Sequence, residues 1–289
     1  MHEEHDPGLQ GWHLLGEVDP SNLVDARLQL HWAAQVLAAV GYTHMEKAGD
    51  DGQSNTGWVD GMQVLVGRPM EVEPGAFVSL DPANFRIGLH EPGGGELESL
   101  AIAGQTLEQL HEWTSAAIGR RLGADPVELV RPTYDLPDHP VADGQAFDAD
   151  AAALAELGRW IHDGNLVMRD LRAGHRGATM PRLWPHHFDM GMLISLEEHG
   201  NAAEGRSIGL GLSLGDESSD APYWYASPYP NPVGVEAPDL RHGEWEDGDW
   251  FGAKLHATAA LEERDAQSQH RVVREFLDEM AEVCRRMLA

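Results

Sequence analysis

The order of expected elements is repeated along this chain, and the repetition restricts the folds that it can adopt. Each half begins with a helix, continues with three or four short strands and ends with a second helix. Hydrophobic periodicity predicts the first helix at 23–40 and the last at 267–288. We therefore predict an α+β fold of two similar helix–antiparallel-sheet–helix units, an internal pseudo-repeat with the helices packed on one face of each sheet.

Short sequences at corresponding places in the two halves also resemble one another. The segment Trp58–Val66 aligns with Phe188–Leu196 and keeps a Gly-Met pair. The segment Asn84–Pro92 aligns with Pro222–Pro230 and keeps the final proline. These matches favour an internal duplication, although short amphipathic strands can also resemble one another by chance.

Alternation of apolar and polar residues predicts the strands between the helices. The expected strands are 58–66, 76–80, 85–90, 97–103, 183–197, 207–214, 223–227 and 251–259. Two further helices are predicted from residues that favour helix ends. Thr106 and Gln109 match a capping box before a helix that ends near Gly123, and Asp148 or Asp150 caps a helix that continues to about Leu171.

Prolines and glycines mark the expected boundaries between segments. Residues 1–20 lack periodicity, which predicts an irregular N-terminal arm. A first α+β unit is expected at 21–130, and a second unit, which carries the candidate site, at 148–289. Residues 131–147 contain three prolines and several acidic residues, and they predict a linker between the two units.

The charge of the chain argues against two classes of partner. The 289 residues carry a formal net charge of -28 and only two lysines, Lys47 and Lys254. Such a surface repels the phosphates of nucleic acids and anionic membranes, so we expect neither as a partner. No apolar run approaches the roughly 20 residues of a membrane-spanning helix, and the acidic start is unlike a signal peptide, which predicts a cytoplasmic location. Monomer and homodimer both remain open.

Two adjacent histidines, His186 and His187, stand between Trp184 and Asp189 at the start of an apolar run. Side chains on a strand alternate between its faces, so His187 is expected to share a face with Asp189 unless Pro185 turns the chain. His187 and Asp189 could form a general-base dyad or, together with His186, bind a divalent metal such as zinc. A further ligand would come from elsewhere, with His162 among the candidates. The alternative is a pair of histidines hydrogen-bonded at a strand entrance.

Aromatic residues suggest a second kind of site. Trp184, Tyr223, Trp224 and Tyr225 could line a pocket for a flat or sugar-like ligand, or they could fill the core. The nearby acidic residues Asp216, Glu217 and Asp220 could hold Ca²⁺ or Mg²⁺, or could form a solvated turn.

Several of these segments resemble an uncharacterised bacterial family built around a domain of unknown function. The resemblance rests on the helix start at 147–152, the Trp184…Phe188-Asp189 strand, the Gly215-Asp216 turn and the aromatic strand Pro222–Tyr225. It covers most of the chain through loose motifs. The resemblance implies a tandem α+β architecture. Because the family has no assigned activity, it implies nothing about catalysis. The family pattern has small residues where His186 and His187 stand here, and this departure argues against a metal site shared by the whole family.

Absent motifs narrow the chemistry further. The sequence has no Gly-x-x-x-x-Gly-Lys-Ser/Thr loop, no strand-linked Gly-x-Gly-x-x-Gly and no Gly-x-Ser-x-Gly elbow, which disfavours P-loop hydrolysis, Rossmann cofactors and serine-hydrolase chemistry. The single cysteine, Cys284, excludes an internal disulfide and is predicted to be a small core residue. Two hypotheses follow. The first is a metal-assisted or acid/base enzyme acting on a small molecule, and the second is a non-catalytic protein that binds a small molecule or a partner through an aromatic-lined concavity.

Overall fold

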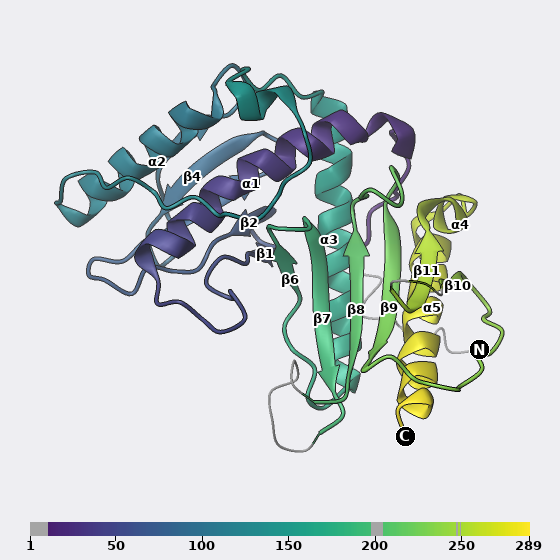
Figure 1. Ribbon diagram of the computed structural model, residues 1–289. Coiled ribbons are helices and arrows are strands. Elements are labelled where there is room, and N and C mark those ends of the chain that lie inside the picture. Colours follow the sequence, from purple (N-terminus) through teal and green to yellow (C-terminus); the bar gives the residue numbers. More distant parts are fainter. Residues whose placement is uncertain (1–10, 198–204, 247, 249) are drawn as a thin grey trace. The chain divides into compact units, whose positions relative to one another are not determined.

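The computed structural model contains helices and two antiparallel sheets, which confirms the predicted α+β class (Figure 1). The structure describes residues 11–197, 205–246, 248 and 250–289, so the first ten residues of the predicted arm lie outside the described residues. Contacts divide the chain into two compact units. We call them unit N, which holds Asn22–Gly158 and Arg182–Phe188, and unit C, which holds Met1–Ser21, Arg159–Pro181 and Asp189–Ala289.

The boundaries between these two units differ from the boundaries predicted between segments. Residues 131–147 belong to unit N, where Val141 and Phe147 are buried. The described part of the arm belongs to unit C, where Trp12 and Leu15 are buried. The described residues of both segments lie mostly outside helices and strands, and irregular backbone can still place single apolar side chains in a core.

Unit N is built around a five-stranded meander. Its elements are α1 (Val24–His44), β1 (Gly57–Val59), β2 (Val64–Val66), β3 (Phe77–Asp81), β4 (Arg86–His90), β5 (Glu96–Ala101), α2 (Leu107–Leu122) and the 3-10 turn η3 (Pro140–Asp143). The strand order is β1-β2-β3-β4-β5, and each neighbouring pair is antiparallel. Both helices contact the sheet and each other, which places them on one face, as predicted.

The ends of these helices show which local signals decide helix length. The capping box of Thr106 and Gln109 begins α2, and Gly123 ends it with a φ of 65°, as predicted. The prediction that Gly41 ends α1 is wrong, because α1 continues to His44. A Cβ on Gly41 would lie 2.1 Å from the carbonyl oxygen of Gln53. Gly41 is therefore a point of close backbone approach rather than a helix end.

The second sheet has six strands. The elements from α3 onward are α3 (Ala151–Gly174), β6 (Arg182–Trp184), β7 (Asp189–Ser195), β8 (Ser207–Ser213), β9 (Tyr223–Tyr229), β10 (Glu244–Glu246), β11 (Gly252–His256), α4 (Ala257–Leu261) and α5 (Ala266–Met287). Strand β6 and the first turns of α3 belong to unit N, and the other elements belong to unit C. The strand order is β10-β11-β9-β8-β7-β6. Asp150 caps α3 by accepting a hydrogen bond from the backbone of Ala153 at 2.9 Å. The predicted strand at 251–259 is shorter in the structure: β11 ends at His256, and α4 begins at Ala257.

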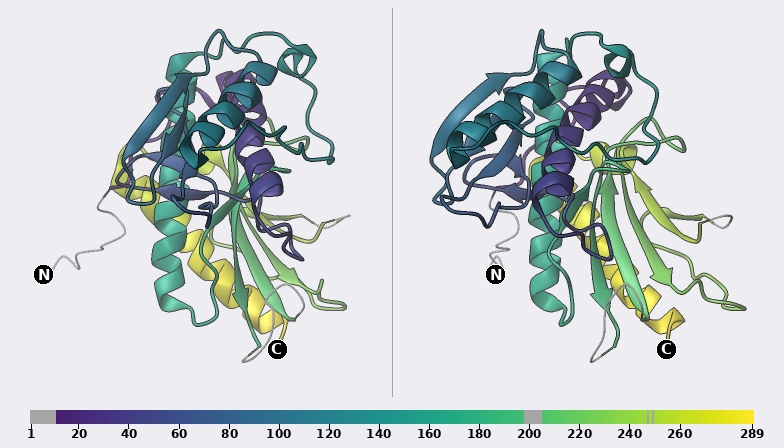
Figure 2. Two further views of the ribbon diagram at one scale, coloured as in Figure 1. Left: turned by 90° about the vertical axis from the view of Figure 1, so that its left-hand side faces the viewer. Right: turned by 60° about the vertical axis from the view of Figure 1, so that its left-hand side comes forward.

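The two faces of the unit C sheet differ in character. Residues paired directly across strands share a face. Leu212 and Trp224 are paired on the buried face, and both lie within 3.6 Å of the position that a Cβ on Gly164 of α3 would take. Figure 2 shows α3 and α5 on the same side of this sheet. The opposite face carries Tyr225, which is paired with Gly211 and Lys254.

Two predicted strands are hairpins in the structure. The segment 58–66 is β1, a four-residue turn and β2, and the segment 183–197 is β6, a four-residue turn and β7. The last residue of each turn has a positive φ, 56° at Gln63 and 55° at Phe188. That backbone region normally selects glycine or asparagine, so neither turn is visible in the sequence. The strand alternation assumed for His186 and His187 is therefore wrong, because both lie in the second turn.

Among the described residues, no helix is both long and apolar enough to cross a membrane.

Candidate functional site

The turn that carries the predicted histidine pair is anchored within unit N. The carbonyl oxygen of Pro185 lies 2.7 Å from Nε2 of His31 and 2.9 Å from the amide nitrogen of Gln35. The rings of His186 and His187 have centroids 4.3 Å apart, and Trp184 lies 6.0 Å from His186. Burial lowers the pKa of His186, and the neighbouring His187 lowers it further. The turn thus holds two adjacent imidazoles beside an indole.

Asp189, the third residue of the predicted group, begins β7 in unit C. One of its carboxylate oxygens accepts a hydrogen bond from the hydroxyl of Tyr225. Burial raises the pKa of Tyr225 well above its usual value of 10, and the charge of Asp189 raises it further. Tyr225 is therefore a protonated donor at neutral pH, and Asp189 is its acceptor.

The predicted set of aromatic residues is divided between two faces of the sheet. Trp224 is 0% exposed and stacks on Trp12 of the arm, with ring centroids 6.4 Å apart. Tyr223 and Tyr225 point to the opposite face, where their centroids are 6.3 Å apart. Trp224 therefore belongs to the core, and of the three β9 residues in the predicted set only the two tyrosines can take part in a common surface.

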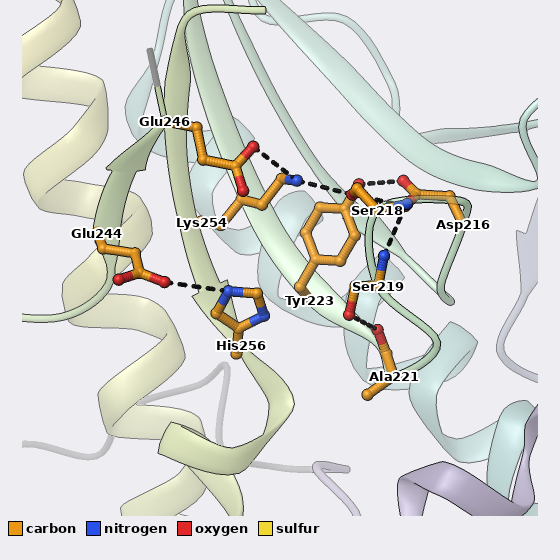
Figure 3. A network of polar contacts seen from close by, with 9 residues as sticks. All are labelled: Asp216, Ser218, Ser219, Ala221, Tyr223, Glu244, Glu246, Lys254 and His256. Atoms are coloured by element: carbon orange, nitrogen blue, oxygen red, sulfur yellow. Dashed lines mark hydrogen bonds and ion pairs between the residues drawn. The ribbon is translucent and has the colours of Figure 1, made fainter. Parts of the chain in front are cut away.

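The acidic turn is part of a closed polar network around Lys254 (Figure 3). Nζ of Lys254 lies 2.8 Å from Glu246 and 2.9 Å from the hydroxyl of Ser218, and it stands over the ring of Tyr223. Asp216 accepts hydrogen bonds from Tyr223 and Ser218. Burial opposes ionisation of Asp216, but these hydrogen bonds hold its pKa below the usual 3.8. The arrangement balances the buried lysine charge and supports a hydrogen-bonded turn.

A second group of titratable side chains lies where the arm meets α3. His13, His162 and Asp163 each offer one ligand atom, and the three atoms lie within 4.8 Å of one another. Asp163 is 0% exposed and His162 is 6% exposed, whereas the side chain of His13 is 39% exposed. Imidazole nitrogen and carboxylate oxygen are ligands that zinc prefers. No other group of three among the described residues meets this distance.

Asp163 holds the arm through both carboxylate oxygens. The backbone nitrogen of His13 lies 3.1 Å from Oδ1 and 3.2 Å from Oδ2, and Nδ1 of the His13 ring lies 3.2 Å from Oδ1. The carboxylate therefore fixes both the backbone and the ring of His13. A divalent ion could replace the proton that the His13 ring shares with Asp163, because the same nitrogen and oxygen atoms are metal ligands.

The carbonyl oxygen of Gly11 sets the tautomer of His162. Its Nε2 lies 3.0 Å from the carbonyl oxygen of Gly11. A carbonyl only accepts hydrogen bonds, so Nε2 of the neutral ring carries the proton and Nδ1 keeps its lone pair. Gly11 has a φ of 111°, a backbone conformation that favours glycine. A carbonyl that orients an imidazole in this way is a common second partner of metal-binding histidines.

Sequence reasoning identified His162 only as a third ligand for another site. The available signal was the His162-Asp163 pair beside Ile161 on a helix with an apolar stripe, where a buried carboxylate needs a partner. His13 lies 150 residues before Asp163, and nothing in the irregular arm indicates where it packs. The three side chains of His13, His162 and Asp163 therefore come together only in the folded chain, and no short stretch of sequence predicts the group.

Comparisons with known protein families, with curated proteins and with solved structures give no match. A function for this protein is therefore inferred from its own residues and their geometry.

Proposed function

We propose that this protein binds one divalent transition-metal ion, with zinc as the best match, at His13, His162 and Asp163. The observation that carries the proposal is the convergence of three ligand atoms within 4.8 Å. Two nitrogens and one oxygen suit zinc better than calcium or magnesium, which prefer oxygen ligands alone. The carbonyl oxygen of Gly11 orients the ring of His162, and the carboxylate of Asp163 orients the ring of His13.

We further propose that the ion serves metal-assisted hydrolysis of a small molecule. Three protein ligands leave one position of a tetrahedral zinc for water, which is the pattern of catalytic rather than structural sites. His13 is the exposed member of the group, so solvent and a small substrate would approach from its side. A zinc ion held by these three residues would supply the chemistry of metal-dependent hydrolases, in which the ion makes water a better nucleophile at neutral pH.

Metal analysis of protein purified without a histidine tag tests the binding. After treatment with a chelator and addition of ZnCl₂, we expect one equivalent of zinc per chain by calorimetry and elemental analysis. The variants His162→Gln and Asp163→Asn should lose this binding. His242→Gln is the matched control, because His242 pairs with Glu275 at 3.1 Å outside the group and should leave the stoichiometry unchanged.

A wild-type protein that binds no stoichiometric zinc contradicts the proposal, as does unchanged binding in both variants. Far-UV circular dichroism of each variant separates loss of a ligand from loss of the fold. Cobalt gives a second readout, because its visible absorption bands report coordination directly.

The group predicted at His186, His187 and Asp189 stays a prediction, and the same measurements include it. His187→Ala should leave the zinc stoichiometry unchanged if His13, His162 and Asp163 hold the ion. A loss in His187→Ala but not in His162→Gln would favour the histidine pair. A metal-free protein whose tryptophan fluorescence responds to a metabolite would favour the non-catalytic alternative.

A further inference from the structure

The outer face of the unit N sheet contains a serine and a histidine in direct contact. Oγ of Ser79 on β3 lies 2.8 Å from Nε2 of His90 on β4. The two side chains are 3% and 4% exposed. This is the distance that joins a nucleophilic hydroxyl to its general base in serine enzymes.

Gly88 makes this contact sterically possible. It is paired with Ser79 across the two strands, and a Cβ at Gly88 would lie 2.7 Å from Nε2 of His90 and 2.9 Å from Oγ of Ser79. Any other residue would push the serine and histidine apart. The ring of His90 also stacks on Phe77, with centroids 5.0 Å apart and planes 8° apart, which fixes its orientation.

The pair borders a hollow of 250 Å³ on the same face, whose wall also includes Met62, Val64 and Arg86. Its volume lies below the roughly 300–1,000 Å³ of sites for drug-sized ligands, so it suits a small acyl group. The guanidinium of Arg86 donates hydrogen bonds to Glu96 and Ser99. Arg86 lines the same hollow as Ser79, together with Asp81 and Glu96, so its guanidinium would be the cationic group available to stabilise the negative charge that a carbonyl oxygen gains during attack.

The protonation state of His90 suits a base. Burial lowers the pKa of His90, against opposing effects of the Gly94 backbone and Glu96. Among the described residues no hydrogen bond of normal length and angle reaches Nδ1 of His90, although the Gly94 backbone is close enough to raise its pKa. The imidazole is therefore neutral at neutral pH, and its Nε2 can accept a proton from Ser79.

We propose that Ser79 and His90 form a reactive site, separate from the metal group, that transfers small acyl groups from activated esters. Oγ of Ser79 attacks the ester carbonyl carbon, and its proton passes to Nε2 of His90. The bond between the carbonyl carbon and the leaving oxygen breaks, and the leaving alcohol takes that proton. Water then attacks the acyl-serine by the same route and releases the carboxylic acid. No nucleophile elbow is required, because such sites are defined by geometry and recur on unrelated folds.

Labelling with a fluorophosphonate tests the site. The reaction is run in EDTA, so that no metal bound at His13, His162 and Asp163 contributes to it. The two proposals can then succeed or fail separately. We expect one phosphonyl group per chain, located on Ser79 by peptide mass spectrometry, and a burst of p-nitrophenol from p-nitrophenyl acetate. Ser79→Ala should abolish both signals.

His90→Gln should slow labelling by about 100-fold or more, the usual contribution of a general base. Ser54→Ala is the matched control: Ser54 is also 3% exposed, but its hydroxyl donates to the backbone carbonyl of Asp51 at 2.8 Å. The Ser54→Ala protein should react with the fluorophosphonate at the same rate as the wild type. Equal labelling rates in wild type and folded His90→Gln overturn the proposal. If His90→Gln does not fold, the test rests on the wild type alone. A rate of Ser79 labelling no faster than the labelling rate of free N-acetylserinamide would then overturn the proposal.

Discussion

The hydroxyl of Tyr225 on β9 donates a hydrogen bond to the carboxylate of Asp189 on β7, across the intervening strand β8. The ring reaches Asp189 because Gly211 and Gly191 beneath it have no side chains. The Tyr225 hydroxyl lies 3.1 Å from the position of a Cβ on Gly191. A single tyrosine thus ties together three strands on the face opposite the helices.

Tyr225→Phe should destabilise the protein by roughly 1.5–3 kcal/mol, the usual contribution of a hydrogen bond to a charged group. Urea unfolding measures the change, and the slope of the transition should stay constant. The control is Tyr229→Phe on the same strand, because Tyr229 is 55% exposed. Its effect should stay within about 0.5 kcal/mol. Equal effects of the two substitutions would show that the Tyr225 hydroxyl adds nothing.

Gly211→Ala should destabilise the protein by at least about 2 kcal/mol through overpacking. Its Cβ would lie 2.3 Å from Cζ of Tyr225 and 2.6 Å from the carbonyl oxygen of Met190. Gly209→Ala in the same strand is the matched control, since its nearest neighbour would be the Ser227 hydroxyl at 3.3 Å. Thermal unfolding should show a much larger loss for Gly211→Ala. A Gly211→Ala protein as stable as Gly209→Ala would contradict this account.

Acid should destabilise unit N through His31 before most carboxylates titrate. Burial, assisted by the nearby charges of Arg27 and His187, lowers the pKa of His31 from 6.5 to about 4 against the opposing hydrogen bond to the Pro185 carbonyl. The unfolded state binds the proton first, so the stabilisation is complete above pH 6.5 and is lost as the pH falls toward 4. The shift corresponds to about 3 kcal/mol.

The measurement is the free energy of unfolding at pH values between 7 and 4 in wild type and in His31→Gln. Carboxylates contribute equally to both proteins, so the difference between the two curves isolates His31. The wild type should lose more stability over this interval. Parallel curves would mean that His31 has the same pKa in the folded and unfolded states.

Cys284 should be inert to thiol reagents in the folded protein. It is fully buried in α5, and burial raises the pKa of its thiol to about 12. The reactive form is the thiolate, which is then scarce at neutral pH. With Ellman's reagent we expect no colour from native protein and one equivalent after addition of guanidinium. Rapid reaction of the native protein would contradict the burial.

Local chemistry in the sequence was sufficient for several parts of this fold. The α2 boundaries follow from Thr106, Gln109 and Gly123, whose side-chain and backbone preferences act within one helical turn. Phe188 shows why the β6–β7 turn was not predicted. A phenylalanine at a φ of 55° is held there by its surroundings, including the ring of His31 stacked 4.9 Å from its own.

The candidate sites were predicted less completely, because they too depend on tertiary packing. His162 and Asp163 are neighbours on a helix that the sequence does predict, but His13 reaches them from an arm without periodicity. Ser79 and His90 lie on two correctly expected strands, yet their contact depends on the exact register that pairs Ser79 with Gly88. Strand registers and long-range packing are properties of the whole chain and not of a short window.

The discontinuous course of unit C has a consequence for how the protein is made. Leu15 exchanges hydrogen bonds with Gln269 at 2.9 Å and 3.1 Å, so the arm packs on the final helix. On the ribosome, Asn22–Gly158 emerges as one stretch and can begin to fold while the chain is still growing. The arm emerges before that stretch but must wait for α5. The arm is therefore synthesised before Asn22–Gly158 but reaches its native place after that stretch can fold.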